Sequence, residues 1–332
     1  MSLRGQGFVG SHGRYGLRVA TGVLGVLGLV GFLACSGEAG TTVRPSVPGI
    51  PTVPPVGTAQ TLDLACWNLE WFGDGTYGPT DETLQLQNVK GVLRGMDCDL
   101  WALEEVVSAT AFQSLLSDLP GYAGLLANDP RVAQGSTYYG ATEQKVALVY
   151  KTSLATVESA QIILTDHDTD FAGRPPLEVR LRVALNGRTE TLYVVCLHAK
   201  AGSDSSSYQR RVNAAAALKT YLDTVRSGET VVVLGDFNDD LDASIVTGQP
   251  SPYQAFVTDT VHWFTPTKAL SDAGVSSLLG YADPVDHHLV TRNVASRLVP
   301  GSVQAFPAHT YVTAYATTTS DHLPVVSRWT VP

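Results

Sequence analysis

Several apolar runs of the chain end in a carboxylate, an amide or an imidazole. The polar residues at these ends are, in chain order, Asn68, Glu70, Glu104, Glu105, His198, Asp236, Asn238, Asp286, Asp321 and His322. Carboxylate and amide oxygens suit a hard divalent cation such as Mg²⁺, which keeps several waters and needs few protein ligands. Imidazoles beside carboxylates suit proton transfer. Such residue types could hold a cation and transfer protons if the fold brings these positions together.

Each of these residues also has an ordinary explanation when it is taken alone. Asn68 would cap a turn, and the acids at 104 and 105 would lie on the surface. Strand ends, however, are rigid, and side chains that project from several of them can converge on one point. Because all the ordinary explanations would have to coincide in this order, we favour one common site.

The elements that must position these residues are mostly strands. Apolar or alternating runs predict strands at 62–68, 100–106, 146–150, 177–185, 192–197, 231–234, 286–291 and 323–327. Helical spacing predicts helices at 80–96 and 208–225, the second with Val212, Ala215, Leu222 and Val225 facing inward. Many strands and few helices over 61–332 predict one α/β domain, with two packed, mainly antiparallel sheets flanked by helices.

The acidic balance of the chain limits the classes of partner. The formal net charge is −9, and because residues 1–34 hold three arginines and no acid, the remainder carries −12. A protein that binds DNA through a broad basic face has the opposite balance. Acidic groups that hold a cation would fit this charge, although a solvated acidic surface is its commoner cause.

The first 35 residues are typical of a secretory signal. Residues 19–34 are uncharged and follow a basic, acid-free stretch. Recurrent glycines and a run shorter than about 20 residues argue against a spanning helix. The sequence F-L-A-C-S at 32–36 is similar to a bacterial lipoprotein cleavage site, with Phe32 in place of the usual Leu. We therefore expect a signal peptide at 1–35 and a lipid on Cys35; a plain signal peptide or an uncleaved anchor is the alternative.

The segment after the signal differs in composition from the rest. Residues 36–60 are rich in Pro, Gly and Thr, which predicts a semi-extended linker that leads into the domain at 61–332. We expect a monomer at the outer membrane or cell surface, touching the membrane through the lipid on Cys35, or otherwise a secreted or periplasmic protein.

The cysteines form no recognisable metal or redox motif. The four cysteines lie at 35, 66, 98 and 196, without C-x-x-C spacing, which argues against a zinc site. Cys66 and Cys196 lie in apolar runs and are interpreted as buried thiols. A disulfide among Cys66, Cys98 and Cys196 stays open.

The order of the motifs resembles the endonuclease/exonuclease/phosphatase superfamily, which contains deoxyribonuclease I, abasic-site endonucleases, neutral sphingomyelinases and inositol polyphosphate 5-phosphatases. The specific motifs are G-D-F-N at 235–238 and S-D-H-L-P at 320–324, supported by W-N-L-E-W-F at 67–72 and L-E-E-V at 103–106. The resemblance covers 61–332. It implies a deoxyribonuclease I-like four-layered α/β sandwich and a Mg²⁺-dependent phosphodiesterase, with Mn²⁺ or Ca²⁺ as substitute cations.

The resemblance implies a metal site built from Glu105, Asn68, Asp321 and Glu70. Glu105 matches the principal Mg²⁺ ligand, and Asn68 would bond a metal-bound water or the phosphate. Asp321 would support the metal and orient His322. Some relatives carry an Asp near the metal at the position of Glu70.

The resemblance also implies the reacting groups. Asp236 and Asn238 would position and activate the attacking water and bind the phosphate. His198 and His322 would flank the phosphorus and share proton transfer, and which of them is the acid stays open. Asp286 matches an acid that orients one histidine, although two further histidines follow it directly in the sequence.

One arginine is a candidate for holding the phosphate. Arg174, in F-A-G-R-P-P-L, resembles the Arg-x-Pro segment of the family, whose guanidinium meets a phosphate oxygen. A guanidinium matches phosphate geometry with two parallel hydrogen bonds. An ordinary loop arginine before prolines is the alternative.

The motifs and the resemblance leave three possible functions. We expect an extracellular nuclease that acts on DNA or RNA. A sphingomyelinase, phospholipase-C-like enzyme or lipid or inositol phosphatase is the alternative; a lipid enzyme would benefit from an exposed apolar hairpin, for which 261–264 is the only candidate and a buried aromatic pair the simpler reading. A catalytically inert lipoprotein that binds through this fold is the third.

Overall fold

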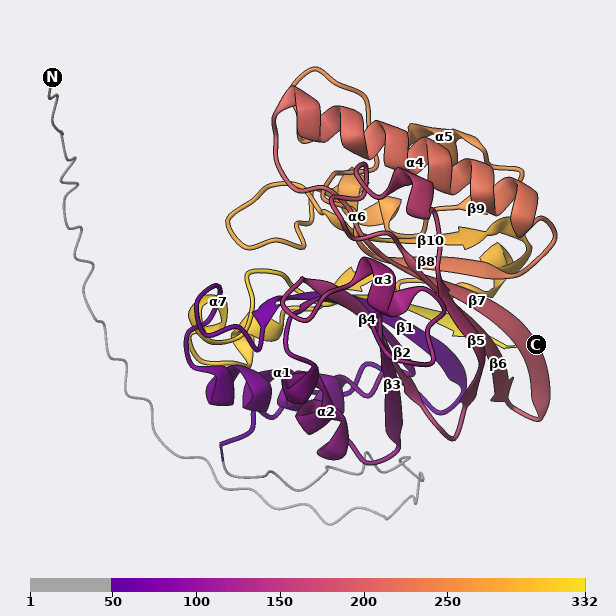
Figure 1. Cartoon of the computed structure of the whole chain (residues 1–332). Helices are drawn as coiled ribbons and strands as arrows, with labels where there is room; N and C mark the ends of the chain where they lie inside the picture. The colour runs from indigo at the N-terminus through magenta and orange to yellow at the C-terminus, as the bar shows by residue number, and fades with distance from the viewer. Residues whose placement is uncertain (1–48, 332) are drawn as a thin grey trace, which may run out of the picture. The chain divides into compact units, whose positions relative to one another are not determined.

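Two six-stranded sheets pack face to face between outer helices (Figure 1). The computed structural model describes residues 49–331. The first sheet has the order β11-β12-β1-β2-β4-β3, with bounds β1 Thr61–Phe72, β2 Leu100–Val106, β3 Tyr122–Leu126, β4 Lys145–Lys151, β11 Gln304–Ala305 and β12 Val325–Thr330. The second has the order β5-β6-β7-β8-β10-β9, with bounds β5 Ala155–Ile162, β6 Leu177–Leu185, β7 Arg188–His198, β8 Val231–Asp236, β9 Trp263–Phe264 and β10 Asp286–Thr291.

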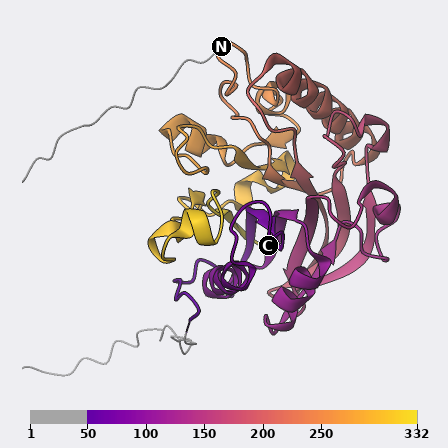
Figure 2. The same cartoon turned by 60° about the vertical axis from the view of Figure 1, so that its left-hand side comes forward.

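The helices lie mainly outside the sheets and in the loops between strands. The α-helices are α1 Glu82–Met96, α2 Ala109–Ser117, α3 Gly135–Tyr138, α4 Ser205–Val225, α5 Gln254–Thr258, α6 Lys268–Ala273 and α7 Tyr315–Thr318. Short 3₁₀ helices are η1 Thr165–His167, η2 Arg292–Arg297 and η3 Ala308–Thr310. Figures 1 and 2 both show α4 on one outer face and α1 with α2 on the other.

Three apolar layers hold the sandwich together. The central layer fills the space between the sheets and includes Leu64, Leu148 and Val179. A second layer packs α1 and α2 on the first sheet, and a third packs α4 on the second sheet through Leu218 and Leu222. Burial of apolar surface on both faces of each sheet stabilises this arrangement. The predicted four-layered α/β sandwich is confirmed.

Each sheet contains one parallel pair among antiparallel neighbours. The parallel pairs are β1 with β2 and β7 with β8, and the other pairs are antiparallel. Parallel neighbours need a crossover connection, and the crossover helices are α1 in the first sheet and α4 in the second. The carboxyl ends of the two strands in each pair therefore meet at one edge of their sheet.

The predicted strands are confirmed as strands, with differences at their ends. The last begins at Val325 rather than at 323, because Pro324 has no N–H and the amide of Leu323 bonds to Ser277 instead. Strands β3, β5, β9 and β11 and helix α2 were not predicted. Val225, predicted to face inward from α4, is 52% exposed.

The end of the predicted linker packs against α1. Residues 50–53 lie against Gly91 and Gly95, where a Cβ on either glycine would come within 2.7 Å of Pro51 or Val53. Val53 is buried, and the amides of Val56 and Gly57 donate to the Met96 carbonyl at 2.9 and 2.8 Å. The packed domain thus starts before residue 61, because glycines one turn apart open a groove that the segment fills. Residues 1–48, with the predicted signal peptide and Cys35, lie outside the described residues.

The cysteines and helices in the described residues bear on two further predictions. Cys66, Cys98 and Cys196 are all buried and free, so the reading of Cys66 and Cys196 as buried thiols is confirmed and no disulfide joins the three. None of the helices between residues 49 and 331 has the length and apolar character needed to cross a bilayer.

Candidate active site

Three strands of the second sheet bring their polar residues into one row. The register places His198 opposite Asp236 in the parallel pair and Asp286 opposite Asp236 in the antiparallel pair. All three residues are at most 1% exposed. Because cross-strand partners lie about 5 Å apart, sheet pairing by itself forms this part of the site.

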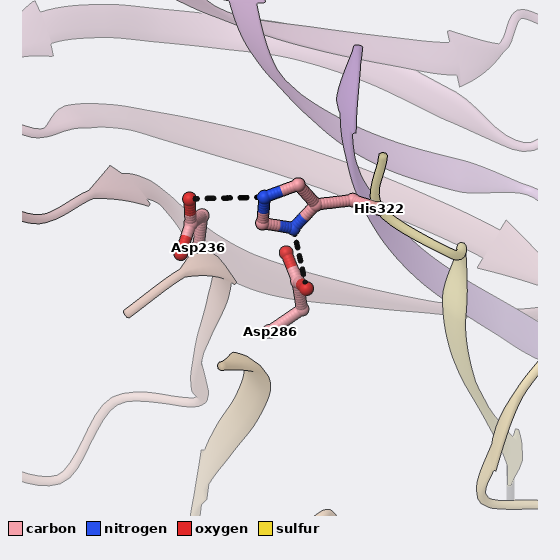
Figure 3. A group of neighbouring side chains, drawn as sticks. All are labelled: Asp236, Asp286 and His322. Carbon is pink, nitrogen blue, oxygen red and sulfur yellow. Dashed lines mark hydrogen bonds and ion pairs between the residues drawn. The ribbon is translucent and has the colours of Figure 1, made fainter. Parts of the chain in front are cut away.

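His322 joins the row from the loop before β12. Its Nδ1 lies 2.8 Å from Asp286 Oδ2, which also accepts a hydrogen bond from Ser277 Oγ at 2.6 Å (Figure 3). The carbonyl of His322 accepts hydrogen bonds from Trp67 Nε1 and the Tyr315 hydroxyl. Burial acts to lower the pKa of His322, but the carboxylates of Asp286, Asp236 and Asp321 together outweigh it and raise that pKa well above its ordinary value. The imidazole is therefore fixed at Nδ1, and its Nε2 faces Asp236.

Asp236 is the common neighbour of the cluster. Its Oδ2 accepts from Asn68 Nδ2 and Asn238 Nδ2, each at 3.0 Å, and lies 3.6 Å from His198 Nε2 and 4.0 Å from His322 Nε2. Burial, reinforced by the charge of Asp286, raises the pKa of Asp236, whereas burial lowers the pKa of His198 well below its ordinary range. One carboxylate oxygen therefore faces both imidazoles.

Asn68 connects this cluster to the first sheet. Its Nδ2 also donates to Glu105 Oε1 at 3.2 Å, and its Oδ1 accepts from the Glu70 amide at 2.9 Å. The second Glu105 oxygen accepts from the Trp71 amide at 3.0 Å. Asn68 thus acts as a bridge between Glu105 and Asp236, which differs from a simple metal ligand.

The loop beyond Glu105 is pinned by a buried lysine. Lys145 Nζ donates to the carbonyls of Val107, Ala141 and Glu143 at 2.8, 2.9 and 2.8 Å. Three carbonyl acceptors replace the water that the ammonium loses on burial. Asn68 therefore holds the side chain of Glu105, and Lys145 holds the backbone two residues after it.

Glu70, Glu105 and Asp321 form an acidic group whose charges act on one another. Glu70 Oε2 is buried without a hydrogen-bond partner in the described residues. Burial, then Asp321 and Glu105, raises the pKa of Glu70 to about 7. Carboxylates that repel one another and keep a lone pair free are the donor set that a hard divalent cation relieves. The residues present fit such a cation.

A second group could also be considered for a metal. Ligand atoms of Asp236, Asp286 and His322 lie within 4.8 Å of one another. However, Asp286 Oδ2 is already bonded to both Ser277 and the His322 imidazole. The contact with Asp286 engages Nδ1 of His322 and leaves its Nε2 and Asp286 Oδ1 without a hydrogen bond in the described residues, so this group is a second possible ligand set beside the carboxylate–imidazole pair.

Arg174 lies beside the same cluster. Its guanidinium donates to the Ala199 carbonyl at 3.0 Å and to Gln144 Oε1, and its Nε has no partner in the described residues. Its charge acts on Glu105 and Asp236, which places it next to both. The remaining N–H groups are free to meet an anion such as a phosphate.

Some predicted roles change in the structure. The Nδ2 of Asn238 is committed to Asp236 and the Ala199 carbonyl, so a phosphate contact from this nitrogen would replace one of these bonds. Asp321 lies 3.8 Å from His322 Nε2, too far for a hydrogen bond, so Asp286 rather than Asp321 orients that histidine. The prediction gave Asp286 to one histidine without saying which, and in the structure that histidine is His322 rather than the neighbouring His287 or His288.

Three neighbours of the motifs are buried. Glu104, the first acid of its pair, is fully buried beside Gly235, and neither of its oxygens has a hydrogen-bond partner in the described residues. Burial, then the charges of Asp286 and Asp236, raises the pKa of Glu104 well above its ordinary value, so it lies behind the cluster. His287 bonds to Thr267, and His288 bonds to Ser327 at 2.7 Å, so these two histidines hold the interior.

Two residues of the site escaped the sequence analysis. Ser277 holds Asp286, and Gln144 holds Arg174. Both come from loops of ordinary composition, so no spacing or motif in the sequence indicates them.

Comparison with known proteins adds a family to this geometry. A sequence model of the Endonuclease/Exonuclease/phosphatase family matches residues 65–322. No curated protein sequence matches the chain significantly.

Solved structures share the fold at low identity. The human Nocturnin catalytic domain is 17% identical with a TM-score of 0.54, covering 82% of this chain and 95% of its own. D. rerio TDP2 with a single-strand DNA product is 14% identical with a TM-score of 0.54, covering 82% and 99%. An AP endonuclease from Archaeoglobus fulgidus is 17% identical with a TM-score of 0.54, covering 81% and 100%.

Proposed function

Because the chain belongs to the Endonuclease/Exonuclease/phosphatase family, whose members are metal-dependent phosphoesterases, we propose that it is a Mg²⁺-dependent nuclease that hydrolyses phosphodiester bonds. The observation that carries the proposal is the position of Asp236. Its Oδ2 faces the imidazoles of His198 and His322 and accepts hydrogen bonds from two side-chain amides. One of these amides, Asn68, also bonds to Glu105, a member of the acidic group. Few structural roles require groups from both sheets to meet in this way.

The residues suggest a division of the work. A divalent cation held by Glu70, Glu105 and Asp321 would neutralise charge on a non-bridging phosphate oxygen. Arg174 would bind another phosphate oxygen. Asp236 would orient the attacking water and accept its proton, since its oxygen is fixed by amides.

The two histidines would act on opposite sides of the phosphorus. His322, with Nδ1 held by Asp286, keeps Nε2 available toward the phosphate. His198 Nε2 lies 3.7 Å from Glu105 Oε1 and 3.6 Å from Asp236 Oδ2, so it sits between the two groups of acids. Both would hold the phosphate in line with the water and stabilise its developing charge.

The structure of segment 261–264 favours a nuclease over a lipid enzyme. Trp263 is 3% exposed and its Nε1 donates to Asp223 at 2.8 Å, while Val261 is 75% exposed. A single exposed valine provides no apolar hairpin to enter a lipid surface. Two of the solved structures with this fold support the proposal by analogy: one is named an AP endonuclease, and the other is TDP2 in complex with a single-strand DNA product.

A substrate panel tests the proposal. Purified protein with Mg²⁺ or Mn²⁺ should hydrolyse bis-p-nitrophenyl phosphate, and EDTA should abolish the activity. Plasmid DNA, RNA and sphingomyelin offered side by side should separate the alternatives. Cleavage of sphingomyelin alone would replace the nuclease with a lipid enzyme, and a lack of turnover with every substrate would favour an inert binding protein.

We further propose that the chain is exported and lipidated at Cys35. The support is the uncharged run at 19–34 followed by the F-L-A-C-S sequence. Labelled palmitate should enter the wild-type protein in a bacterial host, and Cys35→Ser should lose the label. Equal labelling of both proteins would contradict lipidation at this residue.

A further inference from the structure

An aromatic pair stands at the end of β1, beside the acidic group. The rings of Trp71 and Tyr77 have centroids 4.6 Å apart and planes inclined by 33°. Tyr77 is 56% exposed, although Leu69 and Phe72 on the same segment are buried. The pair therefore presents a ring to solvent instead of filling the core.

The pair is tied directly to the candidate metal site. The amide of Trp71 donates to Glu105 Oε2 at 3.0 Å, so the backbone that carries its ring contacts a proposed cation ligand. The backbone that carries the ring is therefore bonded directly to the candidate cation site, so the ring stands on the side of a nucleotide that flanks a phosphodiester bound there.

The loop that carries Tyr77 is held in place. The amides of Thr76 and Tyr77 donate to Asp74 Oδ1 at 2.8 and 3.2 Å, and the Asp74 amide donates to the Trp71 carbonyl at 2.9 Å. Gly78, at φ +67°, lies so close that a Cβ would come within 2.6 Å of the Glu70 carbonyl. The loop thus folds back on the site and holds the exposed ring against Trp71.

We propose that Tyr77, supported by Trp71, is a stacking platform for an unpaired nucleobase next to the cleaved phosphodiester. This inference rests on the proposed nuclease function and narrows its substrate to single-stranded or locally unpaired nucleic acid. Aromatic side chains bind every base through its π-face, and a base paired within a duplex has both faces covered by its neighbours.

The charge of the protein agrees with this form of binding. A body of charge −12 gains little affinity from the release of counterions. Stacking does not need positive charge and can supply the affinity that a basic face supplies elsewhere. The ring lies on the acidic side of the site, where lysine or arginine would compete with the cation for Glu70 and Glu105.

The test compares two single-stranded oligonucleotides of equal length, one normal and one with abasic residues on both sides of a central bond. Tyr77→Ala should raise KM for the normal strand about tenfold with kcat within twofold. It should leave KM for the abasic strand within twofold, and Tyr77→Phe should keep the wild-type values. Tyr311→Ala is the matched control, because Tyr311 is also an exposed tyrosine, stacked on Phe306.

Binding to a protein that cannot turn over separates this inference from the nuclease proposal. In a His322→Ala background with Mg²⁺, fluorescence anisotropy should show about tenfold tighter binding of the normal strand than of the abasic strand. The additional change Tyr77→Ala should remove that preference. Equal binding of both strands before the Tyr77 change overturns the platform. A preserved preference in a protein whose wild type cleaves no nucleic acid keeps the platform and rejects the nuclease.

Discussion

The two sheets contribute to the site in different ways. In the second sheet, His198, Asp236 and Asp286 sit in unbroken register and are buried. In the first sheet, the pairing of β1 with β2 shifts between Asn68 and Phe72, and that of β2 with β4 shifts between Leu103 and Val106. Glu70 and Glu105 lie in these interruptions.

The interruptions carry backbone strain. Glu70, Trp71 and Glu105 have φ of 51°, 55° and 59°, a region that costs non-glycine residues on the order of 1–3 kcal/mol each. The fold therefore holds Glu70 and Glu105 against backbone strain, and holds both beside Asp321 against the repulsion of like charges. The strand pairing of the second sheet runs without a break through its three site residues, whereas that of the first sheet is interrupted at Glu70 and Glu105. Substitutions in the second sheet should consequently lower kcat, whereas substitutions in the first sheet should weaken cation binding.

The largest effect should follow a change in the second sheet. Asp286→Asn removes the charge that holds His322, so kcat should fall at least about a thousandfold, or about 4 kcal/mol of barrier. More Mg²⁺ should not restore it, since the acidic group is intact. Initial rates over a Mg²⁺ titration measure this. Asp283→Asn, an exposed acid in the loop directly before β10, is the control. Recovery of kcat in Asp286→Asn at high Mg²⁺ would contradict the separate roles proposed for the two sheets.

A change in the first sheet should instead weaken the cation. Glu70→Gln keeps the size of the side chain and removes its charge, so the Mg²⁺ concentration for half-maximal rate should rise about 10- to 100-fold. The rate at saturating Mg²⁺ should stay within about threefold of the wild type. Glu158→Gln, an acid on β5 that pairs with Arg180, is the control. A loss of kcat that persists at saturating Mg²⁺ would instead place Glu70 among the reacting groups.

Acid should weaken the second sheet through a buried histidine. Burial lowers the pKa of His288 to about 3, so the folded protein keeps it neutral while the unfolded chain protonates near 6.5. This stability is present above pH 6.5 and is lost as pH falls from there toward 3; at pH 5 the loss is about 2 kcal/mol.

The variant His288→Gln isolates this contribution. Urea unfolding at pH 7 and pH 5 should show a smaller loss in the variant than in the wild type. Buried acids such as Asp63, whose pKa burial raises to about 6, act in the opposite direction, and the difference between the two proteins cancels them. Identical pH profiles would remove His288 from the acid response.

The smallest effect should come from the support of Asp286. Ser277→Ala removes one hydrogen bond to that carboxylate and the acceptor of two buried amides, those of Val285 and Asp286. We expect a several-fold drop in kcat and about 1–3 kcal/mol less stability. Rates and urea unfolding of the same sample measure both. A loss as large as that of Asp286→Asn would mean that the carboxylate is misplaced without Ser277.

Much of this site could be predicted because it lies at the ends of apolar strands. Sequence alone located Asp236 and His198, since an apolar run that ends in a polar residue is unusual for a core strand. The sequence also predicted two packed sheets, because it contains many strand-like runs, of which the alternating run at β6 is the most regular. The family resemblance, rather than periodicity, supplied the individual roles.

What escaped prediction depends on long-range contacts. Half of the residues of strand β5 are polar, without regular alternation, and the strand lies at a sheet edge. Ser277 and Tyr77 gain their significance only from what the fold places beside them. The linker was extended too far because its prolines suggested a tether, while the glycines of α1 that receive it carry no signal of their own.

The segment that covers Gly91 and Gly95 affects how the protein can be engineered. A fusion partner or affinity tag joined at residue 60 would omit Val53 and leave the α1 groove bare, with the Met96 carbonyl missing two of its donors. A gene that starts upstream of residue 49 keeps this natural cover. The useful boundary for expression therefore lies more than a dozen residues before the first residue matched by the family model.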